Sequence, residues 1–336
     1  MTGHAAGGAT PLPIVIAVDG GGSKTDAVAI DLDGTLIASA RGTTSSPHII
    51  GMPRAVELID GLIDELLTQT GPRTIAQTNV YVSGLDLPAE VAAFKTALVG
   101  SAWADAVVDN DLFALLRAGT GEPDAVAVVC GTGINAVGVR ADGLVIRYPS
   151  LGIISGDWGG GWHLGEQALW HAARAADGRG PETSLVAAIP AVYGLDTLQD
   201  VIEGLHFERI PNSDLAQISP AVFDAARAGD AVAGSLVDRQ ADEIVTFAAT
   251  TLRRLDRLDR PVPVVLGGGV IGARDERLLA AIVSGLAAEA PLAHIELVTA
   301  APILGAALLA LEGAGAHSAL SRAREQLESR QAVPVA

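Results

Sequence analysis

Two stretches of the chain share one arrangement of apolar runs and glycine turns. Residues 14–36 read IVIAVDGGGSKTDAVAIDLDGTL, which is an apolar run, three glycines, a second apolar run and an Asp-Gly turn. Residues 124–146 repeat this order around Gly131-Thr132-Gly133, and the glycine turn and the Asp-Gly turn are 12 residues apart in both stretches. Two β-rich runs joined by a short glycine turn predict a hairpin. A fold of two related halves, each with a glycine-tipped hairpin and a third antiparallel strand, is therefore expected.

The first glycine turn has the chemistry of an anion site. It consists of Gly20, Gly21, Gly22, Ser23, Lys24 and Thr25. Without Cβ atoms, the glycines can adopt positive φ and let their N–H groups approach an anion closely, which the hydroxyls and the lysine would also favour. The preceding Asp19 suits a hydrated Mg²⁺, which takes one or two carboxylates. The turn does not match the P-loop, because the serine precedes the lysine and a strand follows, so a polyphosphate ligand has to be argued from the rest of the chain.

Composition narrows the classes of partner. The formal net charge of −17 argues against nucleic acid and against an anionic membrane, since both need a basic surface. The single cysteine, Cys130, excludes an internal disulfide and an all-cysteine metal site within the chain, and it favours the cytoplasm. Residues 1–11 lack the features of a secretory signal and are expected to be a mobile tail. Since the apolar runs are shorter than the roughly 18 residues of a membrane span, a soluble protein is expected.

The rest of the chain alternates predicted helices and strands. Apolar residues at three- and four-residue spacing predict a helix over 53–70, and a strand over 106–108 leads directly to Asp109, Asn110 and Asp111. Asp111 either caps the next helix, as aspartate does well, or has a chemical role if something faces it. A third apolar run ends in Gly267, Gly268 and Gly269, before a helix that begins near residue 275. Residues 181–260 are mainly helical and offer few candidates.

The motifs DGGGSKT, NDLFALLRAG, CGTGIN, GDWGGG, LGGGVIG and APILGAALLAL, read in this order, resemble the sugar-kinase, heat-shock ATPase and actin superfamily. Within it, the chain resembles the N-acetylglucosamine kinases and the BadF-type ATPases, over residues 14–311. The resemblance implies an α/β fold of two ribonuclease-H-like (actin-like ATPase) domains with an interdomain cleft for ATP, Mg²⁺ and a sugar. The expected division is an N-terminal lobe over 12–114, a C-terminal lobe over 115–312, and a helix and tail over 313–336 with the N-terminal lobe as one place to pack.

The resemblance also implies residue roles. Asp111 falls on the catalytic aspartate, which contacts the sugar and accepts the proton of its hydroxyl, and Asp19 falls on the metal position. Asn135, Gly152 and Asp157 fall on sugar-contacting positions. The residues expected to bind ATP are Gly20, Gly21, Gly22, Ser23, Lys24, Thr25, Gly131, Thr132, Gly133, Gly267, Gly268 and Gly269.

One position departs from the family pattern. The family places a sugar-binding asparagine after the third strand, where this chain has Ser46. Serine offers one hydroxyl where an amide offers a donor and an acceptor, so the acetamido preference stays open. Trp158 and Trp162 beside the GDWGGG motif are equally suited to stacking on a sugar and to core packing. His163 and His171 are interpreted as structural.

The expected activity is transfer of the γ-phosphate of MgATP to the 6-hydroxyl of an amino sugar, with N-acetylglucosamine as the first choice. Glucosamine or another hexose derivative remains an alternative acceptor. A BadF-type ATPase that couples ATP hydrolysis to a protein partner is the alternative class, although such activators hold a cluster with several cysteines and this chain has one. The regiochemistry, the nucleotide preference and the oligomeric state are left open, with a homodimer as one option.

Overall fold

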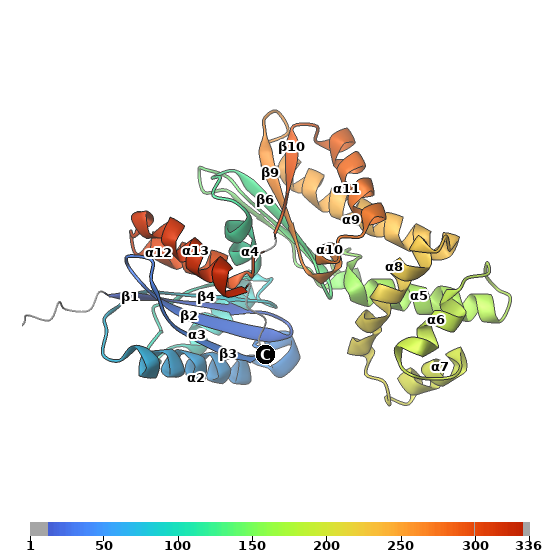
Figure 1. Cartoon of the computed structure of the whole chain (residues 1–336), viewed down its shortest axis with the longest axis horizontal. Helices are drawn as coiled ribbons and strands as arrows, with labels where there is room; N and C mark the ends of the chain where they lie inside the picture. Colours follow the sequence, from blue (N-terminus) through green and yellow to red (C-terminus); the bar gives the residue numbers. More distant parts are fainter. Residues whose placement is uncertain (1–12, 299, 332–336) are drawn as a thin grey trace, which may run out of the picture. The chain divides into compact units, whose positions relative to one another are not determined.

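The structure is a computed structural model that describes residues 13–298 and 300–331 (Figure 1). The N-terminal segment predicted to be a tail lies outside the described residues. The chain divides into two compact units, which are described separately. Unit 1 comprises Met1–Ala118 together with Ala300–Ala336, and unit 2 comprises Gly119–Thr299.

Unit 1 is built on a five-stranded sheet with the order β3-β2-β1-β4-β5. β1 pairs antiparallel with β2, as β2 does with β3, while β4 and β5 extend the sheet in parallel from the other side of β1. The strands are β1 (Ile14–Gly20), β2 (Lys24–Asp31), β3 (Leu36–Thr43), β4 (Ile75–Val82) and β5 (Val107–Asp109). The helices are α1 (Pro47–Ile50), α2 (Met52–Thr70), α3 (Pro88–Ala97), α4 (Leu112–Gly119), α12 (Ile303–Gly313) and α13 (Leu320–Gln331), with a 3-10 turn η3 (His317–Ala319).

Both faces of this sheet are covered by helices. Side chains alternate along a strand, so Ile14, Ile16 and Val18 pack with the core under α2 and α3, while Val15 and Ala17 pack with the core under α12 and α13. Figure 1 shows α2 on one side of the blue strands and α12 and α13 on the other. The fully buried β1 explains why its sequence is a nearly continuous apolar run.

Unit 2 repeats the sheet of unit 1. Its strand order is β10-β9-β6-β7-β8, again an antiparallel hairpin and third strand, extended in parallel by the two later strands. The strands are β6 (Ala125–Cys130), β7 (Ile134–Val139), β8 (Val145–Arg147), β9 (Val262–Gly267) and β10 (Ala293–Leu297). The prediction of two related halves, each with a glycine-tipped hairpin, is therefore confirmed.

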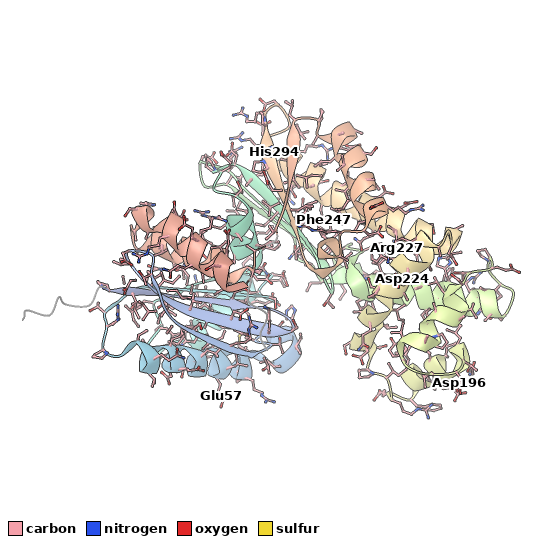
Figure 2. The ribbon with its side chains drawn as sticks, in the orientation of Figure 1. Glu57, Asp196, Asp224, Arg227, Phe247 and His294 are labelled. Carbon is pink, nitrogen blue, oxygen red and sulfur yellow. The ribbon has the colours of Figure 1, made fainter. Side chains whose placement is uncertain are left out.

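Helices make up most of the rest of unit 2. They are α5 (Gly160–Ala176), α6 (Leu185–Val192), α7 (Leu198–His206), α8 (Ser219–Arg227), α9 (Ala231–Arg254), α10 (Gly269–Gly272) and α11 (Glu276–Glu289), with 3-10 turns η1 (Gly152–Ile154) and η2 (Asn212–Ile218). Ion pairs join some of them: Arg227 on α8 contacts Asp224 on its own helix and donates from Nη1 to Asp275 Oδ2, 2.8 Å away. Figure 2 shows Asp224 and Arg227 next to each other. Asp275 in turn caps α11 by accepting from Leu278 N–H.

The last helices belong to unit 1 and not to the second lobe. The sequence analysis assigned residues up to 312 to the C-terminal lobe, whereas α12 packs against β1 and β4 and joins the core of unit 1. α13 adds Ala323 and Leu327 to the same core. Within the part of the chain that the structure describes, no helix combines the length and the apolar character required to cross a membrane.

Candidate functional site

In unit 1, the tip of the β1–β2 hairpin lies close to the residues after β3. A Cβ atom on Gly20 would overlap Ser45 Oγ, and Thr44 Oγ1 donates to Gly21 O at 3.0 Å. This turn does not use the positive φ that glycine permits, because Gly20, Gly21 and Gly22 do not lie in the left-handed region. Glycine is needed at position 20 for space, since the neighbouring segment approaches too closely for a side chain.

Two of the polar residues in this turn have partners inside unit 1. Lys24 Nζ lies 3.1 Å from Asp26 Oδ2, and Arg41 Nε donates to the other oxygen of Asp26 at 2.6 Å. Thr25 is fully buried, and its hydroxyl contacts Thr43 O at 2.7 Å and Ser45 Oγ at 2.9 Å. The Thr25 hydroxyl therefore holds the segment after β3 in place, whereas Ser23 and the Lys24 side chain are exposed at the tip.

Asp19 is a buried carboxyl at the end of β1. Burial raises its pKa well above the usual value, and the nearby Asp111 and Asp26 raise it further, against the opposing effect of Lys24. Asp26 Oδ2 is itself buried, and among the described residues it has the lysine ion pair and no hydrogen bond. A bound cation would favour the ionised form of the buried Asp19 carboxyl, whose pKa its neighbours raise. The donor set, which is hard carboxylate oxygen, fits Mg²⁺.

Asp111 lies between β5 and α4. Its neighbour Asn110 shares the capping role that the sequence analysis considered for Asp111, because Asn110 Oδ1 accepts from Leu112 N–H at 3.0 Å. Burial raises the pKa of Asp111 to about 7, and the nearby carboxylate of Asp86 also raises it. A carboxyl with a pKa close to neutrality is suited to general-base catalysis.

The sheet explains why these residues lie together in unit 1. β1, β4 and β5 are parallel neighbours, so their carboxyl ends meet at one edge of the sheet. Asp19 and Gly20 end β1, Ser83 N after β4 donates to Gly20 O at 2.7 Å, and Asp111 follows β5. Ser46, which is buried, reaches the same edge: a Cβ atom on Gly84 would lie 2.9 Å from Ser46 Oγ.

In unit 2, the predicted nucleotide turns pack against one another through glycine. Gly161 N donates to Gly131 O at 2.8 Å, and Trp162 N to Thr132 O at 2.9 Å. A Cβ atom on Gly160 would lie 2.5 Å from the backbone of Gly133, and one on Gly268 would overlap Cys130 O. The structure thus brings the turn 131–133, the turn 159–161 and the turn 267–269 into one packed group.

Some of these glycines face open space instead. A Cβ atom on Gly133 or on Gly269 would meet no described protein atom within 4 Å, and both residues are exposed. Glycine is therefore not required at these positions by packing within unit 2, which leaves room for a ligand to approach their backbone.

Of the predicted sugar-contacting residues of unit 2, Asn135 lies in β7, and Gly152 and Asp157 lie after β8. Gly152, at φ +64°, uses its carbonyl oxygen to accept from Ser155 N and Asp157 N. Asp157 is buried and accepts a hydrogen bond of 2.5 Å from Ser155 Oγ. Ser150 Oγ donates to Ile134 O at 2.7 Å, which joins this loop to β7 beside the buried Asn135.

Two side chains hold the GDWGGG loop: Gln240, which sequence reasoning missed, and His163, which it interpreted as structural. Gln240 on α9 is fully buried and accepts from Gly160 N at 2.7 Å. His163 Nδ1 lies 2.9 Å from Gly159 O. A signal for Gln240 was present, because it sits in an apolar stripe at four-residue spacing between Leu236 and Ile244. A glutamine in such a stripe indicates a buried polar contact.

The two tryptophans beside this loop have protein partners. The guanidinium of Arg239 lies 3.9 Å from the ring centroid of Trp158, and Trp162 Nε1 donates to Asn212 O at 2.9 Å. Both rings also pack against the core of unit 2. Core packing therefore accounts for Trp162, and one face of Trp158 is occupied by Arg239.

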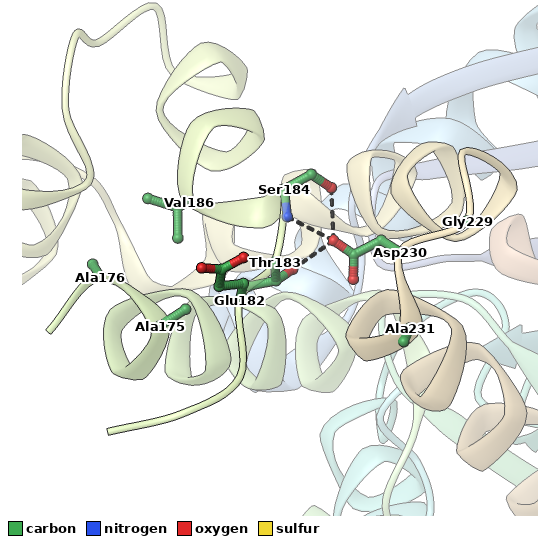
Figure 3. Close-up of a pocket in the computed structure, with 9 residues that line it drawn as sticks. All are labelled: Ala175, Ala176, Glu182, Thr183, Ser184, Val186, Gly229, Asp230 and Ala231. Carbon is green, nitrogen blue, oxygen red and sulfur yellow. Dashed lines mark hydrogen bonds between the residues drawn. The ribbon is translucent and has the colours of Figure 1, made fainter. Parts of the chain in front are cut away.

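A hollow of about 580 Å³ lies elsewhere in unit 2, at the end of α5 and the start of α9 (Figure 3). Its central carboxylate, Asp230, accepts from Thr183 Oγ1, Ser184 N and Ser184 Oγ, and it caps α9 through Ala233 N. These bonds tie the loop before α6 to α9. None of the predicted site residues lines this hollow, so it is not the candidate site.

Comparison with known proteins gives a consistent family. The BadF/BadG/BcrA/BcrD ATPase family matches residues 16–310. The N-acetyl-D-glucosamine kinase of Dictyostelium discoideum is 30% identical over 315 residues, which cover 89% of this chain and 98% of that protein. The N-acetylmuramic acid/N-acetylglucosamine kinase of Clostridium acetobutylicum is 24% identical over 260 residues, which cover 76% of this chain and 85% of that protein.

Solved structures share the fold. A protein proposed to be an N-acetylglucosamine kinase, from Chromobacterium violaceum, has a TM-score of 0.69 at 24% identity and covers 89% of this chain and 99% of its own. A second such protein, from Porphyromonas gingivalis, has a TM-score of 0.62 at 22% identity. The match covers 90% of this chain and 99% of the Porphyromonas gingivalis protein. The architecture is thus that of the two-domain, actin-like ATPase fold, and the chain belongs to the BadF/BadG/BcrA/BcrD ATPase family.

Proposed function

We propose that this protein transfers the γ-phosphate of ATP to the 6-hydroxyl of an amino sugar, with N-acetylglucosamine as the preferred acceptor. The observation that carries the proposal is Asp111, a carboxyl with a pKa of about 7 that lies beside the carboxyl end of β1 and its glycine turn. The acceptor class follows from the relative at 30% identity, which is an N-acetyl-D-glucosamine kinase.

Asp111 is the general base in this proposal. Its ionised carboxylate accepts the proton of the sugar hydroxyl as that oxygen attacks the γ-phosphorus, and a base in this role contributes roughly 10²- to 10⁴-fold in rate. The remaining demand of phosphoryl transfer is alignment and neutralisation of charge. In unit 1, the backbone of residues 20–23 and the Lys24 ammonium contact the phosphates. Thr25 supports the turn through its hydrogen bonds to Thr43 and Ser45.

Asp19 would hold Mg²⁺, and Asp26 lies close enough to affect its charge. The metal ion, when bound, neutralises phosphate oxygens during transfer. Before the ion binds, the raised pKa of Asp19 favours its neutral form, so metal binding and proton release are expected to be linked.

In unit 2, the turns 131–133 and 267–269 bind the nucleotide, and the GDWGGG loop binds the sugar. Gly131, Thr132 and Gly133 contact phosphate, and Gly267, Gly268 and Gly269 contact the adenosine. The exposed Gly133 and Gly269, which no packing contact requires, support this division. Asn135, Gly152 and Asp157, together with Ser46 of unit 1, contact the sugar.

Glucosamine or another hexose derivative is the alternative acceptor, because Ser46 offers less to an acetamido group than an asparagine would. The alternative class is an ATPase that drives a protein partner. Cys130 argues against a cluster-bearing activator, since the only cysteine of this sequence is fully buried in β6 and burial raises its pKa to about 12.

The test is an ADP-release assay with MgATP and a panel of sugars, namely glucose, glucosamine, N-acetylglucosamine and N-acetylmannosamine. We expect N-acetylglucosamine to give the largest stimulation and the product to be its 6-phosphate, identified by NMR. Stimulation by glucosamine alone would change the acceptor and keep the reaction. ATP turnover that no sugar increases would contradict the kinase proposal.

A further inference from the structure

A chain of hydrogen bonds in unit 1 links the segment that carries Ser46 to the turn that carries Asp111. It begins at His48 on α1, whose Nε2 lies 2.7 Å from Glu90 Oε1. Glu90 Oε2 accepts from Asp86 N at 2.9 Å and from Leu87 N at 2.8 Å, which fixes the first turn of α3. A single glutamate thus joins α1 to the loop between β4 and α3.

The next link reaches the base. Asp86 Oδ1 accepts from Asn110 Nδ2 at 3.0 Å, and Asn110 Oδ1 accepts from Leu112 N at 3.0 Å. Asn110 is buried, and its own N–H donates to Asp109 Oδ1 at 2.7 Å. Asn110 and Leu112, the two neighbours of Asp111, are therefore both held by hydrogen bonds. The Asn110 side chain is in turn held by Asp86.

At its other end, this series of hydrogen bonds reaches the tip of the β1–β2 hairpin. Ser46 N donates to Thr44 Oγ1 at 3.2 Å, and Thr44 Oγ1 donates to Gly21 O. Gly84, at φ +81°, allows the segment with Ser46 and His48 to lie close to the end of β4. A Cβ atom on Gly84 would lie 2.9 Å from Ser46 Oγ and 3.1 Å from the His48 ring. The hairpin tip, the Ser46 segment and the Asp111 turn are thus connected in one hydrogen-bonded unit.

The same three side chains, His48, Asp86 and Glu90, hold ligand-type atoms within 4.8 Å of one another. A metal ion is not needed to explain this grouping. Both oxygens of Glu90 already accept hydrogen bonds, one from His48 and one from backbone N–H groups, and Asp86 already accepts from Asn110. The arrangement is that of a satisfied network.

We propose that His48, Glu90 and Asp86 are positioning residues for transfer: they hold the Ser46 segment and the Asp111 turn in a fixed relation, so that the acceptor hydroxyl meets the base. The kinetic part of this inference rests on the proposed kinase function. A relay of this kind matters because a displacement of about 1 Å between a base and its substrate can cost on the order of 100-fold in rate.

The kinetic test compares His48→Ala with His48→Gln, which keeps an N–H donor for Glu90. For His48→Ala we expect kcat to fall roughly 10-fold and the KM for the sugar to rise, with the KM for ATP unchanged. His48→Gln should recover most of the loss. The matched control is His294→Ala on β10 of unit 2 (Figure 2), because His294 pairs with Glu296 at 3.9 Å and is similarly exposed but has no link to Asp111. It should leave kcat within about twofold of the wild type, as exposed pairs contribute little.

A second test does not depend on the reaction. Amide hydrogen exchange of His48→Ala should be faster at Leu87, which Glu90 holds, and also at Leu112, which Asn110 holds. His294→Ala should change neither amide. If Leu87 alone responds, the link from α3 to the Asp111 turn is absent and the inference is wrong.

The outcomes separate the two proposals. A wild-type protein that phosphorylates no sugar contradicts the proposed function, while the exchange result still decides the network. An active wild type with His48→Ala at full kcat, or an equal loss in His48→Gln and His48→Ala, overturns the positioning role. A stoichiometric zinc or manganese ion in the purified protein that is lost in His48→Ala would overturn it too, in favour of a metal site.

Discussion

At the scale of single residues, Asp111 sets the expected pH dependence of the reaction. Its pKa of about 7 arises first from burial and then from the carboxylate of Asp86. The base must be ionised to accept a proton, so kcat/KM for the sugar should fall as the pH drops through about 7. Asp86→Asn removes the neighbouring charge, so the fall in kcat/KM should occur at a lower pH. The measurement is the pH profile of kcat/KM for the wild type and for Asp86→Asn. Profiles that fall at the same pH would contradict the prediction.

The same carboxyl is expected to destabilise the folded protein at high pH. Its folded pKa lies above the unfolded value, so the stability it contributes is complete below the unfolded pKa and is lost as the pH rises through about 7. Asp111→Asn should therefore raise the midpoint of thermal unfolding at pH 8 and change it little at pH 4, while transfer falls roughly 10²- to 10⁴-fold and ATP still binds. Equal shifts in the midpoint at both pH values would contradict the argument.

Sequence reasoning named Asp111 as the candidate base but did not predict the contacts of Asp86 and Asn110 beside it. Asp86 and Asn110 are 24 residues apart, and their hydrogen bond depends on β4 and β5 being neighbours in the sheet. No local pattern encodes that pairing. Gly20 illustrates the opposite case: its importance was evident from the sequence, but the physical reason is the approach of Ser45 and not the handedness of the turn.

At the scale of elements, the glycine turns of unit 2 contain glycines that close packing requires and others that face open space. Gly160→Ala places a methyl group 2.5 Å from the backbone of Gly133 at φ +83°, so we expect a lower Tm, by roughly 5 °C or more, together with weaker ATP binding. Gly178→Ala, at φ +79° with open space around it, is the matched control for backbone strain alone. Differential scanning calorimetry and ATP titration of both variants provide the measurement. A Tm for Gly160→Ala no lower than that of Gly178→Ala would contradict the assignment.

Element types were predictable from the sequence where patterns were strong. The hairpin repeat, the helix 53–70 and the strand ending in Gly267 follow from apolar periodicity and glycine. The apolar run of β4 starts only at Val80, yet the strand begins at Ile75, because the intervening polar residues pair with each other: Gln77 donates to Asn79, and Asn79 donates to Tyr81. Polar residues that satisfy one another within a strand give no apolar signal.

At the scale of the whole molecule, the chain returns to unit 1 after completing unit 2. α12 has no polar side chain over residues 303–311, so its periodicity could not show which sheet it covers. Gly305 settles the matter in the structure, since a Cβ atom there would overlap Ala114 O on α4. The assignment of residues 303–312 to the second lobe failed for this reason.

Deletion of residues 300–336 should therefore damage unit 1 although the deleted segment is distant in sequence from β1. The deletion uncovers the sheet face that carries Val15, Ala17 and Ile30 and exposes a large apolar surface. We expect an aggregated product or one that has lost cooperative unfolding, measured by circular dichroism and size-exclusion chromatography. A soluble, cooperatively unfolding truncated chain would show that α12 and α13 are dispensable.

The junctions of unit 2 carry a further consequence. Unit 2 is an insertion in unit 1, and its two ends meet: a Cβ atom on Gly119 would lie 3.0 Å from Val298 Cγ2. Gly119 and Val298, near the first and the last residue of unit 2, therefore lie side by side, and two covalent connections join the units. Cleavage of either connection by a protease would leave the other intact, so a singly nicked molecule should stay in one piece until denaturant releases it.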